Sequence, residues 1–391
     1  MSTFLFTDAH DDFRASVRSF SQSRLAPGYM ARASSSEFFW DTYRELGRQG
    51  LLGLGVSEEN GGQGADLITV GIACEEIAGA DYNAAFTVFN ASVAGGMLEK
   101  NLQPGLREKW LPGVLSGELL TGLALTEPES GSDAQAMRMK ATRVEGGWLL
   151  NGEKTSSSLA AHAHGLVVFA KTSQDGGTRS VTAFFVPLDA PGITRHALND
   201  IGFKPIGRAA VAFEDVFVPD ENLMGEVGRG FQMVMGEFDY TRSLLGLMCY
   251  GSAQAAIDMT VAYAKQRKAF GQPIGRFQGV SFPLAEHATY LEGVKWLSYH
   301  ALALRMAGRP HTKEAAMIKW WGPQAAVRAI HDCIVLHGHV AYSEDLPLQQ
   351  LLRDVSGLEI GDGTPQIQKM IVAREMFGRE YLPYAAPKAT S

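Results

Sequence analysis

The sequence predicts an α+β protein with a helical N-terminal domain, a β-rich central domain and a helical C-terminal domain. Apolar residues recur at helical spacing toward both ends, whereas short β-branched and aromatic runs separated by turn residues occupy the middle. With 391 residues, the chain is long enough for two or three domains, each with its own core. We therefore expect domains over residues 1–118, 119–225 and 226–391.

The N-terminal domain is expected to be α-helical. Phe13, Val17 and Phe20 lie on one face of a helix if the segment is helical. The helical pattern continues through the stretch from Leu46 to Leu54, and a turn rich in glycine follows at positions 61–64. This part of the chain therefore predicts helices joined by tight turns.

The central domain contains four runs that predict strands: Trp148 to Leu150, Leu166 to Ala170, Val181 to Val186 and Val211 to Val218. Turn residues separate the runs, so we expect an antiparallel β domain or a small barrel. The hydroxyl-rich segment from Asn151 to Ser158 follows the first run and is interpreted as a loop.

The C-terminal domain is expected to be a four-helix bundle. Apolar residues at helical spacing predict helices at 253–264, at 284–297 with an end near Gly308, from Thr312 to Leu336, and from Ile367 to Phe377. Gly225, Gly228 and Gly230 could suggest a nucleotide-binding loop, but no Rossmann-type strand and helix surround them. We interpret them as a turn between domains.

Composition and charge narrow the class of protein. The apolar share of 46% and charged share of 20% are typical of globular proteins, and the net charge of −7 argues against nucleic-acid binding. The three cysteines lie far apart without a CxxC pair, which fits a reducing cytoplasm. The acidic start of the chain lacks a signal-peptide pattern. No apolar run reaches the ~20 residues that a membrane helix needs, so we expect a cytoplasmic protein.

Two pairs of histidines raise the question of a metal site. His162 with His164, and His337 with His339, lack a cysteine or carboxylate cluster at ligand spacing. We therefore predict no metal.

The run from Gly361 to Gln366 contains the strongest candidate for a catalytic residue. It places the carboxylate of Asp362 between two glycines, immediately before the last predicted helix. Glycine allows the backbone to turn tightly and to approach a ligand, so a carboxylate held there can move a proton. The alternative is an aspartate that only stabilises the helix N-terminus through capping and the macrodipole.

A second polar loop heads the β region. Leu123 to Leu125 lead into a hydroxyl-rich segment from Thr126 to Asp133, whose N–H and O–H groups can serve a planar polar ligand or a thioester arm. A local turn stabilised by its own hydroxyls explains the same segment.

In combination, these segments closely resemble the acyl-CoA dehydrogenase family of flavoproteins over nearly the whole chain. Six family signatures occur in order and at family spacing. They are TEPxxGSD at Thr126 to Asp133, NGEK at Asn151 to Lys154, FDxxR at Phe238 to Arg242, RxxFG with a later glutamine at Arg267 to Gln278, RD at Arg353 and Asp354, and EGTxQIQ, with one change, at Asp362 to Gln368.

The resemblance implies non-covalently bound FAD, an acyl-CoA substrate, a homotetramer, and an electron-transfer flavoprotein as electron acceptor. Asp362 would be the general base that removes the α-proton while the β-hydride passes to the flavin. The implied substrate contacts are Ser132, Asp239, Arg242, Gly361 and Gly363. The implied cofactor contacts, some of them to the FAD of a neighbouring subunit, are Leu123, Leu125, Thr126, Gly131, Ser132, Ser156, Ser158, Arg267, Phe270, Gln278, Leu336, Gly338, Thr364 and Gln366.

Two departures from the family pattern indicate the substrate. Asp362 replaces the usual glutamate, so the base is one methylene shorter, and Gly361 replaces a common tyrosine, which empties volume at the acyl end. Together they resemble the branch that acts on alicyclic thioesters such as cyclohexanecarboxyl-CoA, and they suggest an α-branched or cyclic acyl group.

Further departures concern the flavin. Ser156 stands where relatives carry a tryptophan, which affects flavin tuning and electron exit, and the segment from Val335 to Ala341 differs from the family's glycine-rich pattern. Three alternatives stay open: an enoyl-CoA reductase on the same scaffold, a straight-chain dehydrogenase, and a non-catalytic flavoprotein or acyl-CoA binder. The acid retained at Asp362 argues against the last of these.

Overall fold

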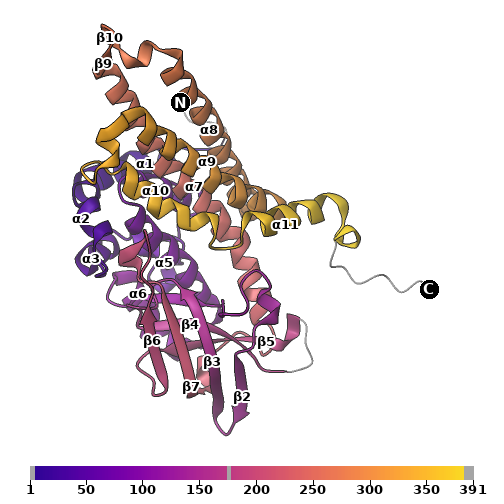
Figure 1. Cartoon of the computed structure of the whole chain (residues 1–391). Coiled ribbons are helices and arrows are strands. Elements are labelled where there is room, and N and C mark those ends of the chain that lie inside the picture. Colours follow the sequence, from indigo (N-terminus) through magenta and orange to yellow (C-terminus); the bar gives the residue numbers. More distant parts are fainter. Residues whose placement is uncertain (1–4, 174–177, 383–391) are drawn as a thin grey trace. The chain divides into compact units, whose positions relative to one another are not determined.

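A computed structural model describes residues 5–173 and 178–382 of the chain (Figure 1). It contains the expected order of helices, strands and helices. The helices are α1 Asp8–Phe20, α2 Tyr29–Ser34, α3 Trp40–Arg48, α4 Leu67–Ala78, α5 Tyr82–Asn101, α6 Pro104–Ser116, α7 Gly230–Gln266, α8 Gln278–Met306, α9 Thr312–His337, α10 Leu348–Ser356 and α11 Pro365–Phe377. The strands are β1 Thr121–Ala124, β2 Lys140–Val144, β3 Gly147–Ser157, β4 Gly165–Lys171, β5 Val181–Pro187, β6 Ile193–Ala197, β7 Ala209–Pro219, β8 Leu223–Met224, β9 Lys268–Ala269 and β10 Gln272–Pro273.

The chain divides into two compact units. The sheet unit comprises Ala31–Val70 and Phe86–Phe238, and therefore contains strands β1 to β8. The bundle unit comprises the other described residues, in segments that end at Met30, run from Gly71 to Ala85, and begin at Asp239. Each unit brings together segments that are distant in sequence.

The sheet unit is built on one eight-stranded sheet in the order β6-β7-β3-β2-β4-β5-β8, with β1 paired to β4. The pairings are antiparallel except for β1 with β4 and a single parallel pair between β2 and β4. The parallel pairing aligns β1 with the first half of β4, from Thr121 beside Gly165 to Ala124 beside Val168. The sheet is therefore predominantly, but not entirely, antiparallel.

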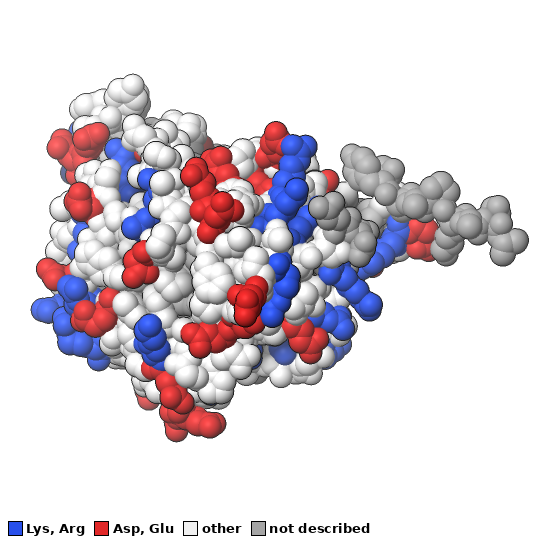
Figure 2. Space-filling model, turned by 90° about the horizontal axis from the view of Figure 1, so that it is seen from below, with Lys and Arg blue, Asp and Glu red and all other residues white. Residues whose placement is uncertain are grey.

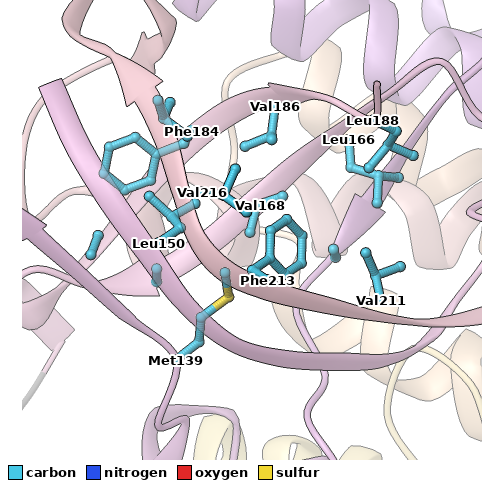
Figure 3. Packing of buried hydrophobic residues seen from close by; sticks show 14 of the residues in the cluster. Met139, Leu150, Leu166, Val168, Phe184, Val186, Leu188, Val211, Phe213 and Val216 are labelled. Carbon is cyan, nitrogen blue, oxygen red and sulfur yellow. The ribbon is translucent and has the colours of Figure 1, made fainter. Parts of the chain in front are cut away.

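The core of the sheet unit consists of apolar side chains that converge from β3, β4, β5 and β7 (Figure 3). Leu150, Val168, Phe184 and Phe213 are among those buried. In β4 and β5 nearly every residue is buried, as expected for strands covered on both faces, whereas β7 alternates between buried and more exposed positions.

The segment after the first predicted strand differs from the prediction. Asn151 to Ser157 are not a loop but the second half of β3, which pairs with β7 through two register shifts. The segment is polar, so its composition does not predict a strand. It becomes one only by pairing with β7, which lies far away in sequence. Lys154 and Ser157 of this half point into the protein and are buried.

The N-terminal part contains one further correction. The stretch from Leu46 to Leu54 does not form a single helix, because α3 ends at Arg48 and Gly50 takes a left-handed conformation with φ 72°. A short 3₁₀ turn at Leu51–Gly53 follows. Glycine adopts this conformation without the steric cost that a β-carbon would add.

The bundle unit contains α8, α9, α11 and, from Asp239 onward, α7. The boundaries of α9 and α11 are close to those expected, whereas α8 ends near the expected Gly308 but begins at Gln278, before the expected Leu284. Helix α7 begins earlier than its apolar pattern suggested, at Gly230. The helices approach closely at Gly246, where an added β-carbon would lie 2.3 Å from Ile318 Cγ2 and 2.5 Å from Ser298 Oγ. Such contact requires glycine, because side chains at a tight helix crossing would separate the backbones.

Within the described residues, no helix is long and apolar enough to cross a membrane. The same residues contain no cluster of three or more histidine, cysteine, aspartate or glutamate side chains arranged to hold a metal ion. On the face drawn in Figure 2, acidic and basic side chains are scattered among uncharged ones.

Candidate active site

Asp362 lies in the turn between a 3₁₀ turn at Gly357–Glu359 and helix α11. Its backbone is left-handed, with φ 54°, a conformation that aspartate tolerates better than most residues with a β-carbon. Thr364 caps α11, and its hydroxyl oxygen accepts a hydrogen bond from the N–H of Ile367 at 3.5 Å. The helix cap is therefore Thr364, which leaves the carboxylate of Asp362 for another role.

Two buried side chains donate hydrogen bonds to the backbone carbonyls of this turn. The Lys319 ammonium, on α9, donates to the carbonyl oxygens of Leu358 at 2.6 Å and Gly363 at 3.3 Å. The Gln368 amide, on α11, donates to the carbonyls of Asp362 at 3.2 Å and Gly363 at 3.3 Å. Lys319 is 1% exposed and Gln368 is fully buried. These bonds fix the peptide groups on either side of the aspartate.

A second cation lies beside the same turn. Arg242, on α7, is 6% exposed and pairs with Asp239 Oδ1 at 3.0 Å, while the Thr312 hydroxyl donates to Asp239 Oδ2. A β-carbon placed on Gly363 would lie 3.9 Å from Arg242 Nη2. The guanidinium is therefore packed against the turn that carries Asp362.

The electrostatic setting of Asp362 suits a proton acceptor. Burial raises the pKa of its carboxyl, while the nearby Lys319 and Arg242 cations lower it without cancelling the rise. Burial in turn lowers the pKa of both Lys319 and Arg242, against the opposing effect of Asp362 on Lys319 and of Asp239 and Asp362 on Arg242. A general base works best when its pKa approaches the working pH.

The two glycines that flank Asp362 differ in whether the local structure requires a residue without a side chain. Gly363 has φ 97°, and a β-carbon there would lie 2.2 Å from Gln368 Nε2. Gly361 lacks a positive φ, and a β-carbon there would meet only Gly357 O, at an ordinary 3.5 Å. The fold therefore demands glycine at 363, whereas at 361 the backbone would accept a side chain.

In the sheet unit, a buried ion pair holds the loop that follows β1. The ammonium of Lys154, on β3, donates to Leu125 O at 2.9 Å and to Glu127 Oε1 at 2.8 Å. Glu127 also accepts bonds from the N–H groups of Arg138 and Met139, and Thr155 N–H donates to Thr126 O at 2.8 Å. Burial lowers the pKa of Lys154 to about 8, against the effect of Glu127.

Buried hydroxyls beside this loop lack protein partners. Among the described residues, no hydrogen bond reaches the hydroxyl oxygens of Ser130 and Ser157, although both residues are buried. Ser156, between Thr155 and Ser157, is exposed and left-handed, with φ 54°. A buried polar group without a partner is costly, so these hydroxyls fit a bound polar ring that is not part of the chain.

The remaining predicted cofactor contacts lie at one end of the bundle. Arg267 and Phe270 lie in the β9–β10 hairpin region after α7, and Phe270 is 95% exposed. The ring of Tyr263 stacks on His337 with centroids 4.4 Å apart, which brings the end of α7 to the end of α9. Leu336 and Gly338 are therefore near the hairpin, and Gln278 begins α8.

Within the bundle unit, the structure brings together Asp239, Arg242, Gly363 and Thr364 around Asp362 and its neighbour Gly361; Gln366 follows in the first turn of α11 and is exposed. Within the sheet unit, Leu123, Leu125, Thr126, Gly131, Ser132, Ser156 and Ser158 lie on β1, on the loop after it and at the end of β3.

Sequence reasoning missed the supporting roles of three residues: Lys319 and Gln368 donate to carbonyls of the turn, and Thr312 donates to Asp239. A signal for Lys319 was available, because Ala315, Ala316, Gly322 and Pro323 flank it at helical spacing and place it on the buried stripe of α9.

Family models of the acyl-CoA dehydrogenases match three successive parts of the chain. The N-terminal domain matches residues 7–118, the middle domain residues 122–216 and the C-terminal domain residues 228–377. The order agrees with the helical, β and helical parts of the structure.

Individual relatives cover almost the whole chain. An acyl-CoA dehydrogenase of Bacillus subtilis is 35% identical over 369 residues, which is 93% of this chain and 97% of that protein. The mitochondrial 2-methylacyl-CoA dehydrogenase of Solanum tuberosum is 31% identical over 96% of this chain and 92% of its own.

Among solved structures, butyryl-CoA dehydrogenase of Megasphaera elsdenii is 30% identical, with a TM-score of 0.91 over 96% of this chain and all of its own. An FAD complex of PigA is 26% identical, with a TM-score of 0.92 over 97% of this chain and all of its own. The chain therefore belongs to the acyl-CoA dehydrogenase family, whose enzymes are oxidoreductases that act on the CH–CH group of acyl-CoA thioesters.

Proposed function

We propose that this protein is an FAD-dependent acyl-CoA dehydrogenase for α-branched or alicyclic acyl groups, with Asp362 as the general base. The main support is the pair formed by Asp362 and Gly361. The carboxylate is partly buried and its pKa is raised, while the preceding residue is a glycine that the backbone does not require. Space beside a short base suits a substrate whose α-carbon carries an extra substituent.

The chain's residues divide the work. Asp362 takes the α-proton, and its own backbone N–H is the proposed donor to the thioester oxygen, which makes that proton more acidic. Ser132, Asp239 and Arg242 remain proposed contacts of the CoA arm, although the ion pair with Asp239 and the burial of Arg242 favour a role in shaping the site. FAD, when bound, accepts the hydride.

The residues of the sheet unit fit this cofactor. The unpartnered hydroxyls of Ser130 and Ser157 are donors and acceptors that a flavin ring can satisfy, beside Leu125 and Thr126. The similarity to the PigA structure, an FAD complex, supports the same assignment. The similarity to a 2-methylacyl-CoA dehydrogenase supports the substrate class, while the similarity to butyryl-CoA dehydrogenase makes a straight short chain the competing substrate.

Assembly and electron transfer complete the proposal. Phe270 is 95% exposed and Tyr342 is 91% exposed at the hairpin end of the bundle, which suits burial against another subunit of a homotetramer. Arg267 and Gln278 would then reach the neighbour's FAD, and a monomeric mass in solution would contradict this. An electron-transfer flavoprotein is the proposed acceptor. Three buried free thiols suit a reducing compartment such as the cytoplasm.

The test is the anaerobic absorbance of the flavin after addition of cyclohexanecarboxyl-CoA, 2-methylbutyryl-CoA or butyryl-CoA. We expect the oxidised flavin band to disappear fastest with the first two thioesters. Fast bleaching by butyryl-CoA beside slow bleaching by both others would refute the substrate class. Stable flavin with all three would refute the dehydrogenase direction.

Two variants test whether Asp362 is the base and whether Gly361 sets the preference for the acyl group. Asp362→Asn should retain flavin but lose about 10²- to 10⁴-fold in bleaching rate, the usual contribution of a general base. Gly361→Val should slow the cyclic thioester more than butyryl-CoA. Gly357→Val is the matched control, because a β-carbon at 357 meets nothing within 4 Å and the position carries no proposed contact.

A further inference from the structure

We propose that Lys319 is the positioning residue of this active site: its ammonium fastens the turn that carries Asp362 and provides the fixed positive charge that the ionised base faces. The inference rests on the proposed function in that it takes Asp362 as the base. Lys319 is a positioning residue and not a catalytic one, since it acts through the peptide groups and the carboxylate of the turn.

The first support is the pair of hydrogen bonds that Lys319 makes. It donates to Leu358 O at 2.6 Å, four residues before Asp362, and to Gly363 O at 3.3 Å, immediately after it. One ammonium therefore ties together both ends of the segment. A lysine that is 1% exposed must satisfy its donors inside the protein, so these bonds are not exchanged with water.

The second support is the left-handed backbone between these two anchors. Asp362 has φ 54°, a conformation that costs aspartate less than most residues with a β-carbon but that glycine adopts without that cost. Such conformations persist where the surroundings over-determine them, often at functional sites. Lys319 and Gln368 supply that constraint from α9 and α11, because their three target carbonyls belong to Leu358, Asp362 and Gly363.

The third support is the set of charges around the site. The groups that act on Lys319 are Asp362, Cys249, Arg242 and Glu359, and those that act on Asp362 are Lys319 and Arg242. Burial raises the pKa of Cys249 to about 12 and that of the neighbouring Tyr82 well above its usual range, so both stay neutral near pH 7. Arg242 is already paired with Asp239. Lys319, whose hydrogen bonds go to neutral carbonyls, is the cation without a paired carboxylate.

A cation in this position has a defined consequence for the base. A nearby positive charge stabilises the ionised carboxylate and lowers its pKa, whereas burial raises it. Lys319 therefore keeps Asp362 ionised at a lower pH than burial alone would allow. Removing the charge should shift the loss of activity at acid pH upward, which a purely structural lysine would not do.

The experiment compares the pH dependence of the bleaching rate in wild type, Lys319→Met, Lys319→Arg and Lys369→Met. We expect the acid limb of Lys319→Met to move up by about 1 pH unit, with a roughly tenfold lower limiting rate and an unchanged KM. Lys319→Arg should restore the limb. Lys369 lies on α11 and contacts the ring of Trp320 on α9, so Lys369→Met removes a lysine from the same helix pair and should match wild type.

Two further measurements keep the outcome unambiguous. Lys319→Gln retains an amide donor for one carbonyl and carries the same test if the methionine variant does not fold. The infrared carboxyl band of Asp362, identified by its loss in Asp362→Asn, needs no turnover and should titrate at higher pH in Lys319→Met. An unmoved acid limb and an unmoved band in a folded variant would overturn the role of Lys319. Flavin that no thioester bleaches in wild type would instead overturn the proposed function.

Discussion

Each of the two units contains one lysine that is buried beside a segment of the proposed active site, and the two lysines differ in their hydrogen-bond acceptors. Lys154 in the sheet unit donates to Leu125 O and to the carboxylate of Glu127. Lys319 in the bundle unit donates to the carbonyls of Leu358 and Gly363, and meets the carboxylate of Asp362 only through space. The charge of Lys154 is neutralised by Glu127, so this lysine holds the loop after β1. The charge of Lys319 is not neutralised by a hydrogen-bonded carboxylate, so it can act on Asp362, which must change its protonation state.

The largest effect on stability should come from breaking the paired lysine. Lys154→Met leaves the buried Glu127 carboxylate without its cation, so the free energy of unfolding should fall by about 3–5 kcal/mol. Lys319→Met should cost less, because it leaves neutral carbonyls unpaired while it also removes a buried charge. Urea unfolding of both variants measures the difference. Equal losses, or a larger loss for Lys319→Met, would contradict the contrast between the lysines.

A smaller effect should appear as a pH dependence specific to Lys154. Its pKa is lowered to about 8 in the folded protein, against about 10.4 for an unfolded lysine. Between these values the unfolded chain binds more protons than the folded one, so stability rises with pH. The difference in the free energy of unfolding between wild type and Lys154→Met should grow by about 3 kcal/mol from pH 7 to pH 10.5. A flat or falling difference would refute the lowered pKa.

The smallest effects on stability should come from replacing a glycine with alanine, and they should differ between Gly363 in the turn of Asp362 and Gly131 in the loop after β1. Gly363→Ala should cost about 1–2 kcal/mol, because φ is 97° and the new methyl group would displace the Gln368 amide. Gly131→Ala in the sheet-unit loop should change stability by less than about 0.5 kcal/mol, since its φ is not positive and its β-carbon would meet only Thr126 Cγ2, at 4.0 Å. Thermal unfolding of both variants tests this, and similar shifts in Tm would show that the turn at Asp362 is no more constrained than the loop.

Local sequence patterns predicted the helices, whose hydrogen bonds and apolar periodicity lie within one segment of the chain. The apolar periodicity of α9 and α11 is contained within each helix, so their boundaries could be predicted to within a few residues, as could the end of α8 but not its start. The second half of β3 could not, because its residues are polar and become a strand only by pairing with β7. Long-range pairing of this kind leaves little trace in the paired segment itself.

The same division applies to the active site. The order of helical, β and helical parts, the family, and Asp362 as the candidate base between two glycines could all be inferred from the amino-acid sequence, because each depends on short motifs and local patterns that are legible wherever they occur in the chain. The folded arrangement was needed to learn that Gly363 is required while Gly361 is not, and that Lys319 and Gln368 hold the turn. Burial, charge proximity and the hydrogen-bond partner of each carbonyl depend on which helices pack together, and α9 reaches Asp362 only in the folded bundle.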